Sequence, residues 1–221
     1  MTLKERYEKL YGGVIYDTMY HDIRYSKPFV LDQGIKPAWN LPCVMFGHAF
    51  TCKGHIEYHE EDIDDTMRIK MLKGMTPGCI QVMDTNSNYN IALFGDISAK
   101  LAKKFGAVGA VIDGNTRDLS IIESDGFPLF CRGSQPDNAY GIWGIKAFQV
   151  PISVAGIHGR VTIEPGDYIF SDRDGVIVIP KYLIYAVCKL AEERVKKENL
   201  IRKRIDETDD IQQIYDEFGS W

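Results

Sequence analysis

The sequence has no long hydrophobic run and no excess of positive charge, and each absence excludes a class of protein. The best apolar run, Val176 to Pro180, is only strand length, whereas a membrane span needs roughly 18 residues. The net charge is −5, which argues against a protein that binds nucleic-acid phosphates. Residues 1–10 are rich in charge, so we expect no signal peptide. We therefore expect a soluble, cytoplasmic protein with no membrane or nucleic-acid partner.

Cysteine is also scarce, and its placement gives no metal or disulfide pattern. The five cysteines form no C-x-x-C pair: Cys43, Cys52, Cys79, Cys131 and Cys188. Cys52, Cys79 and Cys131 lie in apolar, strand-like surroundings, where a reduced cysteine acts as a small hydrophobe. We predict buried structural thiols rather than catalytic groups, and no disulfides in a reducing compartment.

What is present is typical of a globular chain of one domain. Hydrophobic residues make up 45% and charged residues 26% of the 221 residues, with no repeat and no low-complexity linker. Short apolar runs alternate with helical patterns. They predict strands at 44–51, 78–84, 90–94, 107–112, 127–131, 149–155, 161–164, 168–171 and 176–179. Helices are predicted at 62–72, 98–105 and 183–205, with a short helix inside residues 1–25.

This pattern predicts one α/β domain with a long C-terminal helix. We divide the chain into a helical lead-in (1–25), an α/β domain (26–180), and a C-terminal helix and tail (181–221). The last part would pack on the domain or on a neighbouring subunit.

The densest signal is the run GDISAKLAKKFGAVGAVIDGNTRD at residues 95–118. It begins where a predicted strand ends, and Gly95 would let the backbone turn into a helix that Ser98 could cap. The free N–H groups of such a helix start form a natural carboxylate or phosphate site; an ordinary capped helix is the alternative. The chain lacks the G-x-G-x-x-G and G-x-x-x-x-G-K-[ST] fingerprints, so neither identifies the site further.

The same run ends in Asp113-Gly114-Asn115-Thr116-Arg117-Asp118 after a predicted strand, which puts Arg117 and Asp118 at the tip of a sheet. Arg117 offers a planar fork for a carboxylate or enolate oxygen. Asp118 is a hard oxygen donor that could hold Mg²⁺, an ion that needs only one or two protein carboxylates. A turn stabilised by an Arg–Asp surface pair is an equal alternative.

These residues, in this order, resemble the RraA-like family over roughly residues 30–205. The family contains the metal-dependent (class II) 4-hydroxy-4-methyl-2-oxoglutarate aldolases, which also decarboxylate oxaloacetate, and the regulators of ribonuclease E activity. Before residue 95 the matching positions are Gly34-Ile35-Lys36-Pro37 and Gly47-x-Ala49-x-Thr51. After Gly95-Asp96 they are Gly106-x-x-Gly109-x-Val111-x-Asp113-Gly114-x-x-Arg117-Asp118, Pro128-Leu129-Phe130, Pro151-Ile152-x-Val154-x-Gly156, Pro165-Gly166-Asp167 and Asp172-x-Asp174-Gly175-Val176-x-x-Ile179-Pro180.

The resemblance implies a fold and a metal site. The fold would be a single-domain α/β/α sandwich of the RraA-like, swivelling-domain-like type with a long C-terminal helix. In the family's aldolases, the arginine matching Arg117 contacts the pyruvoyl part of the substrate, and the aspartate matching Asp118 holds Mg²⁺ or Mn²⁺. Members with only a regulatory role tend to lack that aspartate, so the presence of both residues favours an enzyme.

The resemblance also implies how the substrate is bound. The turn matching Gly95–Ser98 would receive the substrate carboxylate on its backbone amides, especially those of Ile97 and Ser98. The aspartate matching Asp96 helps to hold a catalytic water. Such proteins form trimers or dimers of trimers with active sites at subunit interfaces, so we expect a homotrimer or homohexamer.

Many of these aldolases also use a glutamate from the neighbouring subunit's C-terminal helix, and Glu198 is our candidate for it. At 100° per residue, Glu198 falls on the predicted apolar face of the helix, which contains Val187, Ala191, Ile201 and Ile205. A carboxylate on an apolar stripe needs a partner. An ion pair with Arg194, four residues earlier, is an equal alternative, and Glu193 is a weaker candidate.

The segment His55–Asp62 contains two histidines and several carboxylates that could form a metal cluster if it were a strand. We favour a solvated acidic loop that leads into a helix, which could shape substrate choice.

Three functions remain open at this stage. The first is a lyase that cleaves 4-hydroxy-2-oxo acids to pyruvate through a metal-stabilised enolate and decarboxylates oxaloacetate. The second is a regulatory protein that binds a ribonuclease, and the third is a lyase acting on a sugar-acid derivative. The fold alone does not choose among them.

Overall fold

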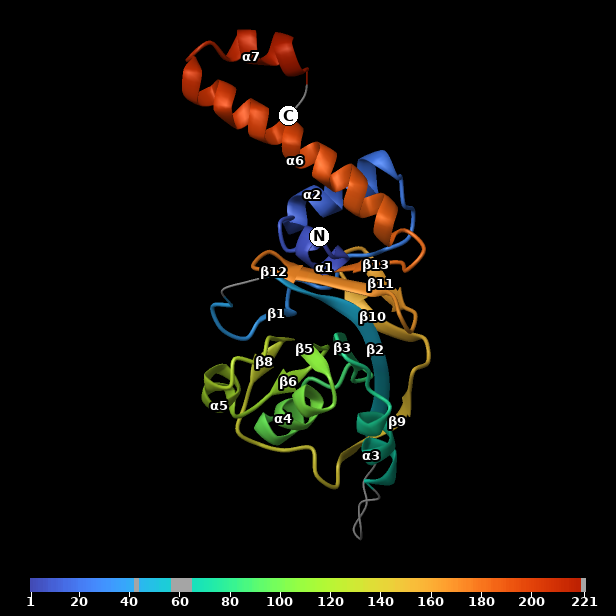
Figure 1. Ribbon diagram of the computed structural model, residues 1–221. Coiled ribbons are helices and arrows are strands. Elements are labelled where there is room, and N and C mark those ends of the chain that lie inside the picture. Colours follow the sequence, from blue (N-terminus) through green and yellow to red (C-terminus); the bar gives the residue numbers. More distant parts are fainter. Residues whose placement is uncertain (42–43, 57–64, 220–221) are drawn as a thin grey trace.

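The computed structural model describes residues 1–41, 44–56 and 65–219. Its centre is a mixed eight-stranded sheet (Figure 1). Seven strands follow the order β1 (Lys36–Pro37), β7 (Leu129–Cys131), β5 (Ala107–Ile112), β3 (Cys79–Asp84), β2 (Met45–Ile56), β12 (Tyr168–Asp172) and β13 (Gly175–Ile179). The eighth, β9 (Trp143–Phe148), pairs with the far end of the long strand β2. Strands β2, β3, β5 and β7 are parallel, and the remaining pairings are antiparallel.

Two smaller sheets complete the strands. The hairpin of β10 (Ile152–Gly156) and β11 (Gly159–Ile163) turns at residues 157–158. Three short parallel strands, β4 (Ala92–Phe94), β6 (Asn115–Thr116) and β8 (Gly133–Ser134), form the other sheet. Strands β4 and β6 of this second sheet end where the residue 95–118 run makes its turns.

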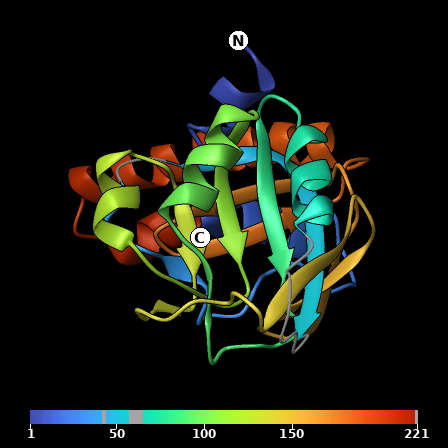
Figure 2. The same ribbon diagram turned by 90° about the horizontal axis from the view of Figure 1, so that it is seen from below.

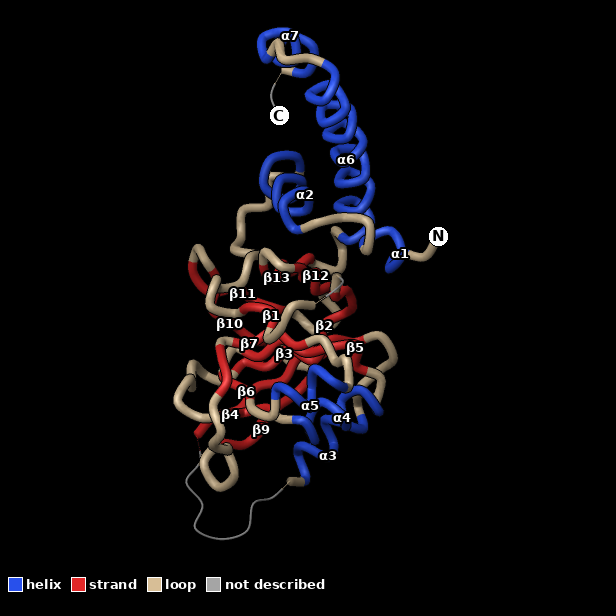
Figure 3. Tube along the Cα trace, turned by 90° about the vertical axis from the view of Figure 1, so that its left-hand side faces the viewer, coloured by secondary structure: helices blue, strands red, loops and turns tan. Residues whose placement is uncertain are grey.

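Two sets of helices pack against the main sheet (Figures 1 and 3). One set is α3 (Thr66–Lys73), α4 (Asp96–Lys104) and α5 (Leu119–Ser124), which lie across one face of the parallel strands in Figure 2. The other set is α1 (Leu3–Tyr7), α2 (Gly12–Asp17), a π-helix (Thr18–Asp22) and α6 (Ile184–Glu207). The last helix, α7 (Ile211–Phe218), lies at the far end of α6. The α/β class with a long C-terminal helix is confirmed.

Three apolar clusters hold these layers together. The first packs α3, α4 and α5 on the sheet and contains Phe50 and Ala102. The second joins the other face of the parallel strands to the β10–β11 hairpin and contains Val111. The third joins β12 and β13 to the lead-in helices and to α6, through residues such as Phe170 and Val187. Burial of each large side chain contributes about 1.5–3 kcal/mol.

The four described cysteines are structural, as predicted. Cys52, Cys79, Cys131 and Cys188 are free thiols inside the protein, and Cys43 lies outside the described residues. Burial raises the pKa of the Cys52 thiol to about 12 and that of Cys131 to about 11. A thiol that stays protonated at neutral pH is a poor nucleophile and a poor metal ligand.

Several predicted boundaries were wrong. Helix α4 begins at Asp96 with Gly95 as its N-cap, so Ser98 lies inside the first turn and does not cap the helix. The predicted strand 90–94 is shortened to β4, and 149–155 becomes β10. Strand β9 and helix α7 were not predicted. On α6, Val187, Ala191 and Ile201 are buried as predicted, but Ile205 is exposed.

No helix within residues 1–41, 44–56 and 65–219 is long and apolar enough to cross a membrane.

Candidate active site

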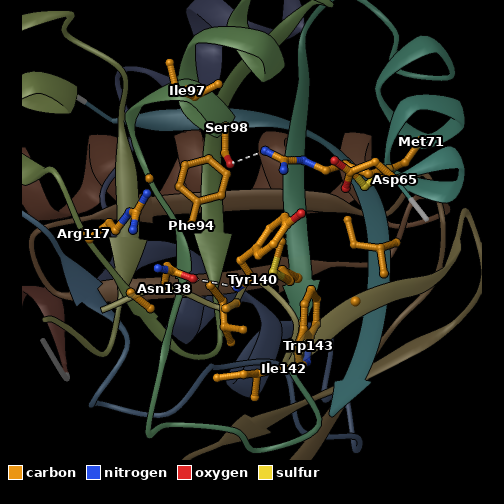
Figure 4. Close-up of a pocket in the computed structure, with 18 of the residues that line it drawn as sticks. Asp65, Met71, Phe94, Ile97, Ser98, Arg117, Asn138, Tyr140, Ile142 and Trp143 are labelled. Atoms are coloured by element: carbon orange, nitrogen blue, oxygen red, sulfur yellow. Dashed lines mark hydrogen bonds between the residues drawn. The ribbon is translucent and has the colours of Figure 1, made fainter. Parts of the chain in front are cut away.

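A pocket of about 790 Å³ lies beside the small parallel sheet, between α3 and the first turn of α4 (Figure 4). Its lining comes from α3 and the residue before it, from Gln81 and Met83 of β3, from residues 92–98 with Arg117 and Asp118, and from residues 138–146, which run into β9. The pocket therefore contains all the predicted site residues of this chain except Glu198: Gly95, Asp96, Ile97, Ser98, Arg117 and Asp118.

The parallel pairing of β4 with β6 explains why residues twenty positions apart meet here. Phe94 ends β4 and Thr116 ends β6, and the two residues are partners in the sheet register. The next residues, Gly95 and Arg117, therefore emerge side by side at the same edge. The amide of Arg117 donates to the carbonyl of Phe94 at 2.9 Å, which fixes the two turns to each other.

Gly95 leaves space that the carboxylate of Asp118 occupies, and a side chain at this position would displace that carboxylate. A Cβ built on Gly95 would lie 2.7 Å from Oδ2 of Asp118, closer than real Cβ contacts. Its backbone is extended (φ −147°), so close approach and not backbone freedom explains the glycine. The absence of a side chain lets Asp118 reach the start of α4.

The first turn of α4 presents free backbone donors to the pocket. The amide of Asp96 donates to Oδ2 of Asp118 at 3.4 Å, and the first bond inside the helix is from Ala99 to the carbonyl of Gly95. Within the described part of the chain, no group accepts a hydrogen bond from the amides of Ile97 or Ser98. With the positive end of the helix dipole, these amides can bind a carboxylate.

Arg117 and Asp118 lie against this turn and contact each other. Nε of Arg117 is 3.3 Å from Oδ2 of Asp118, and its Nη1 donates to the carbonyl of Asp137 at 3.3 Å. Asp118 has a left-handed backbone (φ 59°, ψ 32°), a conformation that costs a non-glycine residue free energy and is concentrated at functional sites. The turn thus holds the guanidinium of Arg117 and the carboxylate of Asp118 next to each other.

Asp118 also has the chemistry to hold a hard cation. Its side chain is 31% exposed, and both of its contacts use Oδ2. Among the described residues, nothing hydrogen-bonds to Oδ1, so this oxygen can serve as a ligand toward the pocket. The same residues contain no group of three or more His, Cys, Asp or Glu side chains that could hold a metal. A single carboxylate with several waters is a coordination that Mg²⁺ uses, so the residues fit that ion.

A buried network of charged groups stabilises the segment 113–118. The carboxylate of Asp113 is fully buried and accepts from Nε of Arg132 at 2.6 Å and from the amide of Ala155 at 3.1 Å. Arg132 also pairs with Asp32 at 2.8 Å, and its guanidinium lies 4.3 Å from the centre of the Tyr89 ring. A buried charge with both partners in place keeps the 113–118 segment in one conformation.

The wall opposite Arg117 was not predicted. It contains Arg68 on α3, whose Nη2 donates to Oγ of Ser98 at 2.9 Å. Trp143 on β9 donates through its ring N–H to the carbonyl of Thr85 at 3.3 Å. The exposed ring of Tyr140 also lines the pocket. No motif identifies these residues: only the pairing of β9 with β2 brings the 138–146 segment to α3.

Glu198 lies far from this pocket within one chain. It is on α6, at the opposite end of the molecule from α3 and α4 (Figures 1 and 3). The predicted ion pair with Arg194 is wrong: Arg194 pairs with Asp22 at 2.6 Å, and Glu198 pairs with Arg202, four residues later, at 2.6 Å. The Tyr11 hydroxyl also donates to Glu198. A role for Glu198 in catalysis therefore requires a second subunit. Glu193 is exposed on the same helix.

The acidic segment His55–Asp62 falls largely outside the described residues. His55 and Ile56 end strand β2, where His55 pairs with Gly144 of β9. Residues 57–62 are not described, so the choice between a metal cluster and a solvated loop stays a prediction.

Comparisons with known proteins agree with the fold. The chain is 39% identical over 118 residues to a Halalkalibacterium halodurans protein that carries the provisional name 4-hydroxy-4-methyl-2-oxoglutarate aldolase. That match covers 53% of this chain and 54% of the relative, so it spans about half of that protein's length. An uncharacterized Methanocaldococcus jannaschii protein is 30% identical over 82% of both chains. The crystal structure of RraAS2 of Streptomyces coelicolor, titled an unusual member of the RNase ES inhibitor RraA protein family, aligns with a TM-score of 0.77. At 22% identity over 90% of this chain and 95% of that chain, it shows the fold alone.

The fold and the pocket define a mixed α/β protein in which a helix start with free amides, an arginine and an aspartate meet at the ends of parallel strands. Residues 15–178 match the family model described as RraA-like, Aldolase/RraA. The chain belongs to the RraA-like family. The resemblance inferred from the sequence is confirmed, and the roles of the individual site residues stay predictions.

Proposed function

We propose that the protein is a divalent-metal-dependent lyase that cleaves 4-hydroxy-2-oxo acids, such as 4-hydroxy-4-methyl-2-oxoglutarate, to pyruvate and that decarboxylates oxaloacetate. One observation carries the proposal: Arg117, Asp118 and the free amides of Ile97 and Ser98 line the same pocket. A relative with an aldolase name supports the same reaction class.

The chain's own groups account for binding of the 2-oxo acid end. The amides of Ile97 and Ser98 would bind the C1 carboxylate at the positive end of α4. The guanidinium of Arg117 would donate to the C2 oxygen. When the bond between C3 and C4 breaks, its electron pair moves toward C2 and leaves pyruvate as its enolate. Donors placed at that oxygen stabilise the charge that develops there, which lowers the barrier.

A Mg²⁺ or Mn²⁺ ion held by Asp118 and waters would supply further positive charge beside the C1 carboxylate and the C2 oxygen. Asp118 fits this role because its Oδ1 is the oxygen left by the contacts that Arg117 and the Asp96 amide make with Oδ2.

A base is needed only for aldol cleavage. The proton of the C4 hydroxyl must leave as the C3–C4 bond breaks and the C4 carbonyl forms. Asp96 lies in the first turn of α4 beside this position and would hold the water that accepts the proton. Glu198 of a neighbouring subunit would assist it in a homotrimer or homohexamer. Decarboxylation of oxaloacetate gives the same enolate without this proton transfer.

The test is pyruvate release from 4-hydroxy-4-methyl-2-oxoglutarate and from oxaloacetate, with Mg²⁺ and with EDTA. We expect EDTA and Asp118→Ala each to reduce kcat/KM for both substrates by about 100-fold or more, the size expected for loss of a group that stabilises the developing charge. Glu123→Gln is the control, because it removes an exposed carboxylate of α5 outside the pocket.

The outcomes separate the candidate functions. Release from oxaloacetate alone would retain the site and assign the chain to another 2-oxo acid. Activity that persists in EDTA or in Asp118→Ala would contradict the metal-dependent mechanism. No release by a folded, metal-loaded protein would favour the regulatory or the sugar-acid alternative.

A further inference from the structure

A second arginine faces the pocket from the side opposite Arg117. Arg68 is on α3 and lines the cavity, and its Nη2 donates to Oγ of Ser98 at 2.9 Å. In Figure 4, Asp65, which precedes α3, and Met71 of α3 lie on one side of the pocket and Arg117 on the other, with Ser98 between them. The start of α4 therefore lies between two arginines, Arg68 and Arg117.

The ion pairing of Arg68 differs from that of the other arginines near the site. Arg132 pairs with the carboxylates of Asp32 and Asp113, and Arg117 contacts Asp118. Within residues 1–41, 44–56 and 65–219, Arg68 forms no ion pair, and its hydrogen-bond acceptor is the neutral hydroxyl of Ser98. A guanidinium carries five N–H donors in a planar fork that matches a carboxylate. A half-buried charge of this kind is stabilised when an anion binds it.

The pocket lining next to Arg68 is apolar. Met71 follows Arg68 by three residues, on the same face of α3, and Leu72 and Met83 line the cavity with it. Gln81 is 2% exposed, and its amide N–H groups contact the sulfur atoms of Cys52 at 3.7 Å and Met71 at 4.0 Å, which are weak acceptors. This part of the cavity suits a short carbon chain; elsewhere the pocket is also lined by the cation Lys146 and by the carboxylate Asp65.

We infer that Arg68 binds a second carboxylate, at the end of the substrate distal to the 2-oxo acid group. The protein would then prefer dicarboxylic 2-oxo acids to monocarboxylic ones of similar length. The inference rests on the proposed function for the orientation of the 2-oxo acid end. It adds the residue that recognises the distal carboxylate, a group that 4-hydroxy-4-methyl-2-oxoglutarate and oxaloacetate both carry.

Binding of two unreactive ligands tests this assignment without catalysis. 2-Oxoglutarate and 2-oxopentanoate share the 2-oxo acid end and a five-carbon chain, and only the first carries a distal carboxylate. Each is titrated by calorimetry, in Mg²⁺, into the wild type, Arg68→Gln, Arg68→Lys and Lys70→Gln. Lys70 is the matched control because it is an exposed cation of the same helix that does not line the pocket.

We expect Arg68→Gln to weaken the binding of 2-oxoglutarate by about 10- to 100-fold, the range of one charge-assisted interaction, and the binding of 2-oxopentanoate by less than about 2-fold. Arg68→Lys should recover part of the loss, and Lys70→Gln should bind both ligands as the wild type does. Equal affinity of the wild type for the two ligands would overturn the assignment. So would an equal loss of both in Arg68→Gln, because Arg68 would then position Ser98 or bind the C1 carboxylate.

The two proposals fail in different ways. A wild type that prefers 2-oxoglutarate through Arg68 but releases no pyruvate from any 4-hydroxy-2-oxo acid would refute the lyase and leave Arg68 as the dicarboxylate determinant. A wild type that releases pyruvate but shows no preference would leave the lyase and refute the role of Arg68.

Discussion

At the residue scale, the site depends on one missing side chain and one strained backbone. Gly95 has no Cβ, so Oδ2 of Asp118 can approach the start of α4. Asp118 has a positive φ angle that aspartate and asparagine tolerate better than most residues. Together they place Arg117 and the amides of α4 around one position. In the proposed lyase, this one position serves two reactions that differ in their need for a base.

Substitutions at Arg117 and Asp96 should separate those reactions. Arg117→Lys replaces a planar fork with a point charge, so we expect kcat to fall about 10- to 1,000-fold for both aldol cleavage and oxaloacetate decarboxylation. Asp96→Asn keeps the shape of the side chain but removes its charge, so we expect a loss of about 100-fold in aldol cleavage and a much smaller loss in decarboxylation. Steady-state kinetics with both substrates gives the ratio. An equal loss in both reactions for Asp96→Asn would rule out its role in proton transfer.

At the element scale, the sequence predicted regular structure well where burial follows a simple period. Strands β3 and β5 match the predicted runs closely because they are buried on both faces. Strand β9 was missed because its residues are only partly buried and give no clear alternation. The start of α4 was misplaced by two residues because Ser98 looked like a cap. In the structure, Gly95 takes that position and Asp96 begins the helix.

The site residues likewise divide into those that a local sequence pattern predicts and those that only packing brings to the pocket. Gly95, Asp96, Arg117 and Asp118 stand next to strand ends, where a motif can be recognised. Arg68 lies in a helix without a motif, so only the packing of α3 against α4 brings it to the pocket. The partner of Glu198 could not be chosen from spacing, because a helix allows pairs in both directions and Asp22 of another element takes Arg194.

Helices α1 and α6 are joined by an ion pair whose strength should depend on pH. Nε and Nη2 of Arg6 each donate to a carboxylate oxygen of Glu192 at 2.7 Å. These bonds hold the pKa of Glu192 below its ordinary value of 4.5. A carboxyl whose pKa is depressed by folding contributes stability above the unfolded pKa, and the contribution is lost as the pH falls through the folded pKa.

We therefore expect Glu192→Gln to lower the free energy of unfolding by about 0.5–1 kcal/mol at pH 7, since the pair is partly exposed to solvent. The difference from the wild type should shrink as the pH falls below 4.5. Urea unfolding at a series of pH values measures it. Glu193→Gln is the control, because Glu193 forms no ion pair with any residue that the structure describes. A difference that stays constant down to acid pH would contradict the ion pair.

At the scale of the whole molecule, the pocket and the C-terminal helix lie at opposite ends of one chain (Figure 1). Helix α6 extends beyond the domain and leaves Leu200 and Ile205 more than half exposed. A carboxylate on that helix can reach an active site only if a second copy of the chain brings it there. If the protein is the proposed homotrimer or homohexamer, oligomers that contain two different variants should behave differently from a protein whose subunits each have a complete active site.

The prediction concerns two variants that are each inactive in aldol cleavage. Asp118→Ala removes the cation ligand from a subunit's own pocket, and Glu198→Gln removes the carboxylate that the subunit would supply to its neighbour. In an oligomer assembled at random from equal amounts of both, about a quarter of the sites contain a native Asp118 and a native Glu198 from the neighbour. Co-expression should therefore restore about a quarter of the wild-type activity per site, although each variant alone has almost none. Light scattering first establishes that both variants assemble like the wild type. Activity of the co-expressed protein equal to the mean of the two variants would show that Glu198 is not shared between sites, and its pairing with Arg202 and Tyr11 would then be its whole role.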